Sequence, residues 1–403
     1  MSSEVMFYVQ HLLGIGHVMR VAAIVREMTR RGVSVTMVSG GEPVKVLDLG
    51  GADLIQLPPA KAMDKTFKPL YDENSRPIDD AWRENRRNRL MEVFKELRPR
   101  VLAVEMFPFG RRQFRFELEP LLEAAKAARP RPQIVCSVRD ILVEKKKPGR
   151  NLEMVELAQA HFDVILAHGD AKFIPFSATF PLAGRLGGKL RYSGYVVDKG
   201  RAAPKGAPGA AAKGKGPGEG EVIVSAGGAG ELLNAALKAR PLSALKDSRW
   251  RLLAGHSLPE DRFQELTAAA FRASESQESA GGFAVERARP DFQTLLANCA
   301  LSISQGGYNT VMEIIAAKAK SVIVPYAGGE ENEQTLRARL LEERGLTRVL
   351  DEDALTPENL AAAVNSALKA PPFPDVPPFD ANGAALSAEI IAGLAKKELK
   401  SQN

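Results

Sequence analysis

The chain has 403 residues, 45% of them hydrophobic and 26% charged, which is typical of a globular enzyme and exceeds what one hydrophobic core usually organises. No uncharged apolar run approaches the ~20 residues that span a bilayer, and there are only two cysteines, Cys136 and Cys299. An integral membrane protein and a disulfide-rich secreted scaffold are therefore excluded. The start of the sequence lacks the basic segment and cleavage site of a signal peptide, so we expect a cytoplasmic protein.

The net charge of +6 is unevenly distributed along the chain. Residues 1–200 hold 32 Lys and Arg against 24 Asp and Glu, or +8, which leaves 23 against 25, or −2, for residues 201–403. A basic first half suits an anionic lipid surface, a phosphorylated acceptor or nucleic acid, and a solvated arginine-rich surface is the plainer interpretation. No recognition motif for DNA or RNA accompanies the charge, so we expect no nucleic-acid partner.

The first half alternates predicted strands with predicted helices. An apolar segment at Val5–Val9 predicts a strand, and helical periodicity over 19–31 is followed by a second strand at 33–38. Further strands are predicted at 101–104, 133–136 and 164–167. This alternation predicts a parallel sheet with helices on both faces.

Two segments between these strands leave alternatives open. The loop 60–82 carries interleaved basic and aromatic residues and is too long for a simple connector, so we expect it to contact a substrate. The helix predicted over 82–97 has a basic side and an apolar side with Leu90, Val93, Phe94 and Leu97. Core packing or an interfacial membrane helix would both produce that pattern.

A composition change marks the boundary between two domains. Residues 201–220 are almost entirely Gly, Ala, Pro and Lys, which is typical of a flexible linker. A new β-α unit begins at 222, with further strands predicted at 250–254, 283–285, 301–303 and 321–325, and a helix start at Thr356. We expect domains at 1–200 and 221–380, joined by the linker 201–220, and a closing helix within 381–403 that packs back on the body.

Three glycine-containing segments lie where a parallel sheet binds its ligands. They follow predicted strands at 13–17, 225–230 and 304–310. At such positions glycines let backbone N–H groups and helix N-termini face phosphate. A glycine turn between strand and helix is also a common packing solution, so each segment alone is weak evidence.

Together with Glu313 and the polar residues 330–334, these segments resemble the GT-B glycosyltransferases related to the bacterial enzyme that adds N-acetylglucosamine to the lipid-linked peptidoglycan precursor. Segments 105–112 and 137–140 are similar to a family of bacterial predicted glycosyltransferases. The resemblance implies an α/β fold of two tandem Rossmann-like doubly wound domains with a cleft between them. It places the acceptor in the N-terminal domain and the nucleotide-sugar in the C-terminal one.

The resemblance also implies roles for individual residues. In that family the glycine turn cradles the diphosphate, the carboxylate at the position of Glu313 bonds the ribose, and polar residues after the proline strand hold the sugar. The donor-binding residues implied are Gly14, Gly16, Ser225, Gly227, Gly228, Gln305, Gly306, Gly307, Asn309, Thr310, Glu313, Glu330, Glu331 and Gln334. On the acceptor side the implied residues are Arg20, Phe109, Arg111 and Arg112.

Departures from the family pattern leave the sugar open. Many relatives have histidine where Gln305 stands, an Asp-Gln pair where Glu330 and Glu331 stand, and asparagine near Gln334. Two carboxylates accept hydroxyl hydrogens but cannot donate to a carbonyl.

His17 is the best candidate for a catalytic base, because an imidazole that titrates near neutrality can take a proton from an acceptor hydroxyl. A histidine that caps the turn or bonds the diphosphate is the alternative. Glu105 is a second candidate, and a simple ion pair with Arg111 or Arg112 is its alternative. The five histidines show no metal-ligand spacing, and the Asp351-Glu352-Asp353 segment is expected to be a solvated loop. We therefore expect no metal and no cofactor.

The resemblance implies an inverting, metal-independent transfer from a UDP-sugar to an unidentified acceptor. An anionic or lipid-linked acceptor and a position peripheral to the inner face of the membrane fit the basic first half. Two other functions stay open: Gly14 to Arg20 also look like the start of the nucleotide-sugar hydrolase of pseudaminic acid synthesis, and a catalytically silent nucleotide-sugar-binding protein is the third reading.

Overall fold

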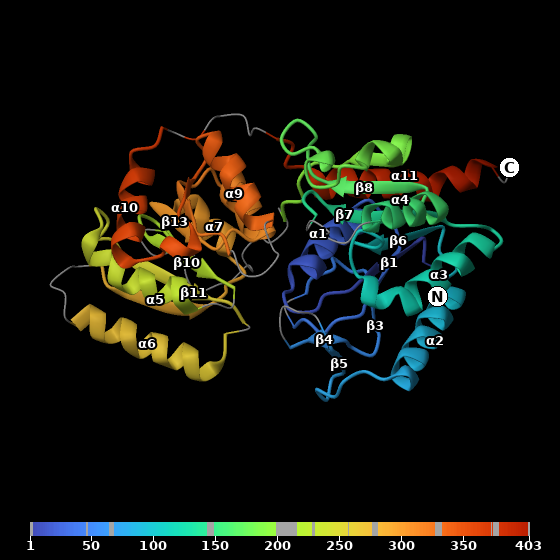
Figure 1. The fold of residues 1–403 in the computed structure, drawn as a ribbon, viewed down its shortest axis with the longest axis horizontal. Helices are drawn as coiled ribbons and strands as arrows, with labels where there is room; N and C mark the ends of the chain where they lie inside the picture. The colour runs from blue at the N-terminus through green and yellow to red at the C-terminus, as the bar shows by residue number, and fades with distance from the viewer. Residues whose placement is uncertain are drawn as a thin grey trace. The chain divides into compact units, whose positions relative to one another are not determined.

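The structure is a computed structural model, and it describes residues 3–45, 47–63, 68–142, 149–198, 216–227, 230–256, 258–275, 281–326, 333–371, 373 and 379–401. The chain divides into two compact units (Figure 1). The first unit contains Met1–Asp198 and Pro378–Asn403, and the second contains Lys199–Pro377. Most of the predicted linker, and the predicted site residues Gly228, Glu330 and Glu331, lie outside the described residues.

The first unit is built on a seven-stranded parallel sheet in the order β3-β2-β1-β6-β7-β8-β9. Its strands are β1 (Val5–Val9), β2 (Val35–Ser39), β3 (Asp53–Gln56), β6 (Val101–Glu105), β7 (Gln133–Arg139), β8 (Val164–His168) and β9 (Leu190–Tyr192). A separate antiparallel pair consists of β4 (Lys61–Ala62) and β5 (Leu70–Tyr71).

Helices cover both faces of this sheet, because alternate residues of its buried strands point to opposite sides. Met6 and Tyr8 of β1 pack with residues of α2 (Asp80–Leu97), α3 (Arg115–Ala127) and α4 (Arg150–His161). Val5, Phe7 and Val9 pack with α1 (Gly16–Arg30) and α11 (Gly383–Ser401). Short 3-10 helices follow at η1 (Arg112–Phe114), η2 (Phe176–Ala178) and η3 (Ala183–Lys189).

Helix α2 belongs to the core of the first unit. The Asp79 side chain accepts a hydrogen bond from the Trp82 backbone N–H and so caps its start. Leu90, Val93, Phe94 and Leu97 are buried against the sheet. The apolar side of this helix is therefore a packing face, and the interfacial alternative is wrong.

The second unit repeats the architecture with a six-stranded parallel sheet in the order β12-β11-β10-β13-β14-β15. Its strands are β10 (Val222–Ala226), β11 (Trp250–Ala254), β12 (Phe283–Arg287), β13 (Leu301–Ser304), β14 (Ser321–Ile323) and β15 (Arg348–Val349). Its helices are α5 (Gly230–Ala239), η4 (Arg240–Leu242), α6 (Glu260–Glu275), α7 (Phe292–Asn298), α8 (Tyr308–Ala316), α9 (Glu333–Glu343), η5 (Glu352–Ala354) and α10 (Pro357–Leu368). The Thr356 hydroxyl caps α10, at the predicted start.

Both sheets reverse their strand order at an equivalent point. In the first unit β1 lies between β2 and β6, and in the second β10 lies between β11 and β13. Open parallel sheets bind ligands outside the carboxyl ends of the strands at such a reversal. The relevant segments are therefore those that follow β1 and β6, and those that follow β10 and β13.

Candidate functional site

A histidine, a carboxylate and an arginine meet at the strand reversal of the first unit. His17 is the second residue of α1, Glu105 is the last residue of β6, and Arg20 lies one helical turn after His17. His17 Nδ1 lies 2.6 Å from Glu105 Oε1, and Arg20 Nη2 donates to the same oxygen at 2.5 Å. The His17 side chain is 21% exposed, whereas those of Glu105 and Arg20 are buried.

Electrostatics decide the protonation states of this group. Burial alone would raise the pKa of Glu105, but His17, Arg20 and Arg111 lower it to about 2, so the carboxylate is ionised. Burial lowers the pKa of His17 to about 4 and overcomes the opposing effect of Glu105, while Arg111 and Arg20 add to the lowering. Neutral His17 donates its Nδ1 proton to Glu105, which leaves Nε2 as the ring's proton acceptor.

Arg111 connects this group to the segment after β1. Its backbone is left-handed, with φ of 59°, and its Nε donates to the backbone oxygen of Gln10 at 2.7 Å. Burial and the nearby Arg139 and Arg20 lower the pKa of Arg111, although Glu105 opposes this. The predicted residue Arg111 thus lies in the field of Glu105, next to the candidate base.

Phe109, which is predicted on the acceptor side, is a buried residue. It is 2% exposed and makes edge-on contacts with Phe176 and Phe180 at 5.5 and 5.2 Å between ring centroids. These contacts give Phe109 a packing role close in the chain to Arg111 and Arg112. Among the predicted acceptor residues, Arg112 is the one whose side chain is substantially exposed, at 54%.

A buried ion pair that the sequence analysis missed holds the segments after β1 and β2. Arg86 of α2 donates to both carboxylate oxygens of Glu117, with Nε 2.7 Å from Oε2, and the Tyr8 hydroxyl donates to Glu117 as well. Arg86 also donates to Gln10 Oε1 at 2.6 Å and to the backbone oxygen of Gly40 at 2.8 Å. A Cβ at Gly40 would lie 2.2 Å from Arg86 Nη2, which explains the glycine there.

The corresponding place in the second unit is formed by two glycine segments. Gly306 has φ of +82°, and Gly307 precedes α8, so Asn309 and Thr310 lie in the first turn of that helix. Gln305 Oε1 accepts a hydrogen bond from the Gly227 backbone N–H at 3.0 Å and joins the segment after β13 to the segment after β10. Ser225 and Ser304 are register partners on the two strands. These predicted residues are therefore brought together, and the helix N-terminus suits a phosphate group.

The remaining predicted donor residues lie on the helices around this point. Glu313 of α8 accepts a hydrogen bond from Gln293 of α7 at 3.4 Å. Gln334 Oε1 of α9 accepts from the Tyr326 backbone N–H at 3.1 Å, after the strand β14. Gly14 and Gly16 belong to the first unit, in the segment between β1 and α1, and not to the unit that holds the other predicted donor residues.

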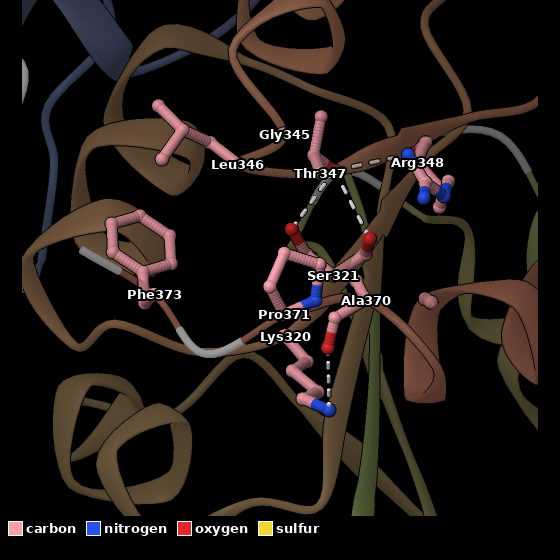
Figure 2. A pocket seen from close by; sticks show the side chains of 10 residues that line it. Lys320, Ser321, Gly345, Leu346, Thr347, Arg348, Ala370, Pro371 and Phe373 are labelled. Atoms are coloured by element: carbon pink, nitrogen blue, oxygen red, sulfur yellow. Dashed lines mark hydrogen bonds between the residues drawn. The ribbon is translucent and has the colours of Figure 1, made fainter.

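Figure 2 shows a small pocket of the second unit, lined in part by residues at the amino ends of β14 and β15, whereas the glycine segments follow the carboxyl ends of β10 and β13. Lys320 and Ser321 stand at the amino end of β14, and Thr347 directly precedes β15. Lys320 Nζ donates to the backbone oxygens of Leu368 and Ala370, and Ser321 Oγ donates to Thr347 Oγ1. These contacts tie the end of α10 and the residue before β15 to the start of β14.

The described residues contain no group of three His, Cys, Asp or Glu side chains that is arranged to hold a metal ion. None of the described helices combines the length and the apolar character that crossing a membrane requires. Asp351, in the predicted solvated loop, pairs with Arg339.

Among known proteins, a family domain matches the second unit. Residues 222–377 match the glycosyltransferase family 28 C-terminal domain. A UDP-N-acetylglucosamine–N-acetylmuramyl-(pentapeptide) pyrophosphoryl-undecaprenol N-acetylglucosamine transferase of Syntrophotalea carbinolica is 29% identical over 183 residues, which is 45% of this chain. The chain spans about half the length of that relative, 48% of it.

Solved structures resemble the chain over nearly its whole length. MurG of Acinetobacter baumannii has a TM-score of 0.55 at 14% identity, covering 96% of this chain and 99% of the other. The spinosyn rhamnosyltransferase SpnG, in complex with thymidine diphosphate, has a TM-score of 0.56 at 14% identity, covering 99% and 100%. The chain therefore has the GT-B glycosyltransferase fold and, through residues 222–377, is related to the glycosyltransferases of family 28.

Proposed function

We propose that the protein is a glycosyltransferase that moves a sugar from a nucleotide diphosphate to an acceptor hydroxyl. The second unit would hold the donor, and the first unit would supply the base. The observation that carries the proposal is the pair formed by neutral His17 and ionised Glu105 at the strand reversal of the first unit. The match of residues 222–377 to a glycosyltransferase domain supports the donor half of the proposal.

The proposed reaction is a single displacement. His17 Nε2 takes the proton of the acceptor hydroxyl as its oxygen attacks the anomeric carbon, and the bond to the diphosphate breaks. Ionised Glu105 stabilises the imidazolium that forms, and Arg20 keeps this carboxylate in place. A single displacement inverts the anomeric centre.

The donor side would stabilise the leaving diphosphate without a metal. The start of α8 and the backbone N–H groups around Gly306 and Gly307 supply the positive end of a helix dipole. Glu313 would accept hydrogen bonds from the ribose hydroxyls. The residues after β14, including Gln334, would contact the sugar. We propose UDP as the nucleotide because the relative in Syntrophotalea carbinolica is named for a UDP-sugar.

A calorimetric panel of nucleoside diphosphates, followed by incubation of labelled UDP-sugars with cell fractions, tests the proposal. We expect UDP to bind without a divalent cation and label to appear in an acceptor. Glu313→Ala should weaken UDP binding, while Gln264→Ala on α6, which removes an exposed side chain bonded to Glu260, should not. Binding that needs a divalent cation would contradict the metal-independent mechanism.

The same experiment separates the alternatives. His17 can activate water as well as a hydroxyl, so label that appears only as free sugar without any acceptor would identify a hydrolase. Donor binding with no turnover in any fraction would identify a nucleotide-sugar-binding protein. Loss of transfer in His17→Ala with unchanged UDP affinity is the result that the proposed mechanism requires.

A further inference from the structure

Three arginines and two glutamates gather where α3 and α4 begin. Arg112 starts η1, Arg115 starts α3, and Arg150 starts α4, while Glu119 and Glu153 lie one turn into the two helices. These segments follow β6 and β7, so the cluster lies along the edge of the sheet where Glu105 ends β6. We call these five residues the arginine cluster.

The two carboxylates do not satisfy the three guanidinium groups equally. Arg115 Nε donates to Glu119 Oε1 at 2.7 Å, and its Nη1 donates to Glu153. Arg150 Nη1 reaches Glu153 Oε2 only at 3.5 Å, and Arg112 Nη2 reaches Glu153 Oε1 only at 3.9 Å. One carboxylate therefore faces three cations, and the two weakest contacts belong to Arg112 and Arg150.

The charge of the cluster is unbalanced toward the positive side. Burial, followed by repulsion from Arg112, lowers the pKa of Arg150 even though Glu153 acts in the opposite direction. Burial alone would raise the pKa of Glu153, but Arg115, Arg112 and Arg150 lower it. An anion placed between Arg112 and Arg150 would relieve this repulsion and complete their hydrogen bonds.

We propose that Arg112 and Arg150 bind a phosphoryl group of the acceptor substrate. Guanidinium forks match phosphate oxygens in a bidentate manner, and a dianion offsets a surplus of positive charge better than a carboxylate does. Arg111, next to Arg112 in the chain, lies in the field of Glu105, and the cluster follows β6 and β7 at the edge of the sheet where the candidate base lies. That the phosphoryl group belongs to the acceptor rests on the proposed function, whereas the anion site itself does not depend on it.

The first test measures inorganic phosphate binding to the full chain by calorimetry, in the presence of saturating UDP. The double variant Arg112→Gln/Arg150→Gln should bind phosphate about tenfold more weakly or worse, as expected from losing charge-assisted hydrogen bonds. The matched control is Arg83→Gln/Arg87→Gln, which removes two exposed arginines of α2 that pair with Asp80 and Glu84. Equal phosphate affinity in the two double variants would overturn the proposal.

A second variant changes affinity in the opposite direction. Glu153→Gln removes the carboxylate that competes with the anion, so phosphate should bind more tightly than to the native chain. A variant that merely fails to fold could not gain affinity, which keeps the test informative. Acetate at the same ionic strength should not compete, and competition by acetate would contradict a phosphoryl site.

Enzyme kinetics separate this proposal from the proposed function. Where transfer is found, Arg112→Gln/Arg150→Gln should raise KM for the acceptor, leave kcat and UDP affinity nearly unchanged, and abolish competitive inhibition by phosphate. Transfer with an unchanged KM would remove the phosphoryl site and leave the function intact. Arginine-dependent phosphate binding without any transfer would support the phosphoryl site and contradict the proposed function.

Two sources of the phosphoryl group can be compared directly. Glycerol 3-phosphate represents a soluble phosphate ester, and vesicles that contain phosphatidic acid represent a lipid headgroup. Binding to either probe supports the site only if it is lost in Arg112→Gln/Arg150→Gln. Binding that persists in this variant would contradict it.

Discussion

His17 and Glu105 define a pH dependence that is specific to this arrangement. His17 must be neutral to act as a base, and its pKa is lowered from 6.5 to about 4. We therefore expect kcat/KM to stay constant as the pH falls from 8 to about 5 and to decline only near pH 4. A pH profile of initial rates checks this, and a decline centred near 6.5 would contradict a buried, neutral His17.

Gln305 allows a prediction about donor affinity. Gln305→Ala removes the acceptor of the Gly227 N–H and with it the contact between the two glycine segments. Because Gly227 is exposed, water can replace this hydrogen bond, so stability should change little. UDP affinity should fall about three- to tenfold, since ordering the segments then costs binding energy. Calorimetry with Gln264→Ala as the control measures it, and unchanged affinity would exclude a positioning role for Gln305.

At the scale of elements, α2 is tied to α3 by a buried ion pair and not by apolar contacts alone. Arg86→Met leaves Glu117 as a buried carboxylate without its guanidinium, so the first unit should lose about 3–5 kcal/mol of stability. The double variant Arg86→Met/Glu117→Gln should recover part of this loss. Hydrogen exchange of the α2 amides in denaturant would measure the stability of both variants. Equal protection of these amides in the single variant and the native chain would contradict a stabilising role for the ion pair.

Helix α11 is linked to the sheet through a buried histidine. His168 Nε2 lies 2.6 Å from Ser137 Oγ, and Nδ1 lies 2.9 Å from Ser193 Oγ and 3.4 Å from Ser387 Oγ of α11. Burial lowers the pKa of His168 to about 3, so the unfolded chain binds the proton first. The stabilisation is complete above pH 6.5 and is lost as the pH falls from 6.5 toward 3.

His168 therefore makes the free energy of unfolding depend on pH, and a variant can remove this contribution. His168→Gln should flatten the fall of unfolding free energy between pH 6.5 and 4.5 by about 1.4 kcal/mol per pH unit. Denaturant unfolding at several pH values measures the slope for both chains. His17 and other histidines with lowered pKa also contribute to this slope. The difference between the slopes of the native chain and the variant therefore gives the contribution of His168. Identical slopes would show that His168 is not neutral in the folded state.

The sequence predicts the central elements better than the peripheral ones, and the reason is burial. Strand β1 is a continuous apolar run, β11 is apolar apart from Arg251, and the predicted bounds of both agree with the observed ones. Strand β3 was not predicted, because its residues are exposed or half-buried and carry no periodic signal. The strands β4, β5 and β15 have two residues each, which is too short for a periodic signal.

Site residues follow a similar division. The glycine turns and His17 stand in recognisable local patterns, so the sequence alone indicates them. Arg86 and Glu117 are 31 positions apart, and the members of the arginine cluster come from three elements, η1, α3 and α4. Their meeting depends on which helices pack side by side on the sheet, which no local pattern encodes.

For the whole molecule, the charge follows the division into units. The first unit carries 34 Lys and Arg against 27 Asp and Glu, or +7, which leaves 21 against 22, or −1, for the second. The basic unit is also the one that we propose binds the acceptor. Positive charge near an anionic membrane adds attraction of ~1 kcal/mol per basic residue close to the surface, so a few residues suffice for reversible docking.

We therefore expect the protein to sediment with vesicles that contain anionic phospholipid and not with neutral vesicles. The attraction should weaken as salt rises, because the Debye length falls from about 10 Å at 0.1 M to about 3 Å at 1 M. Arg112→Gln/Arg150→Gln should weaken this docking more than Arg83→Gln/Arg87→Gln, although both variants lower the net charge by the same amount. If sedimentation is equal for both lipid types, or absent for both, the surface charge does not serve a membrane. The phosphoryl group proposed for the acceptor would then have to be carried by a soluble molecule.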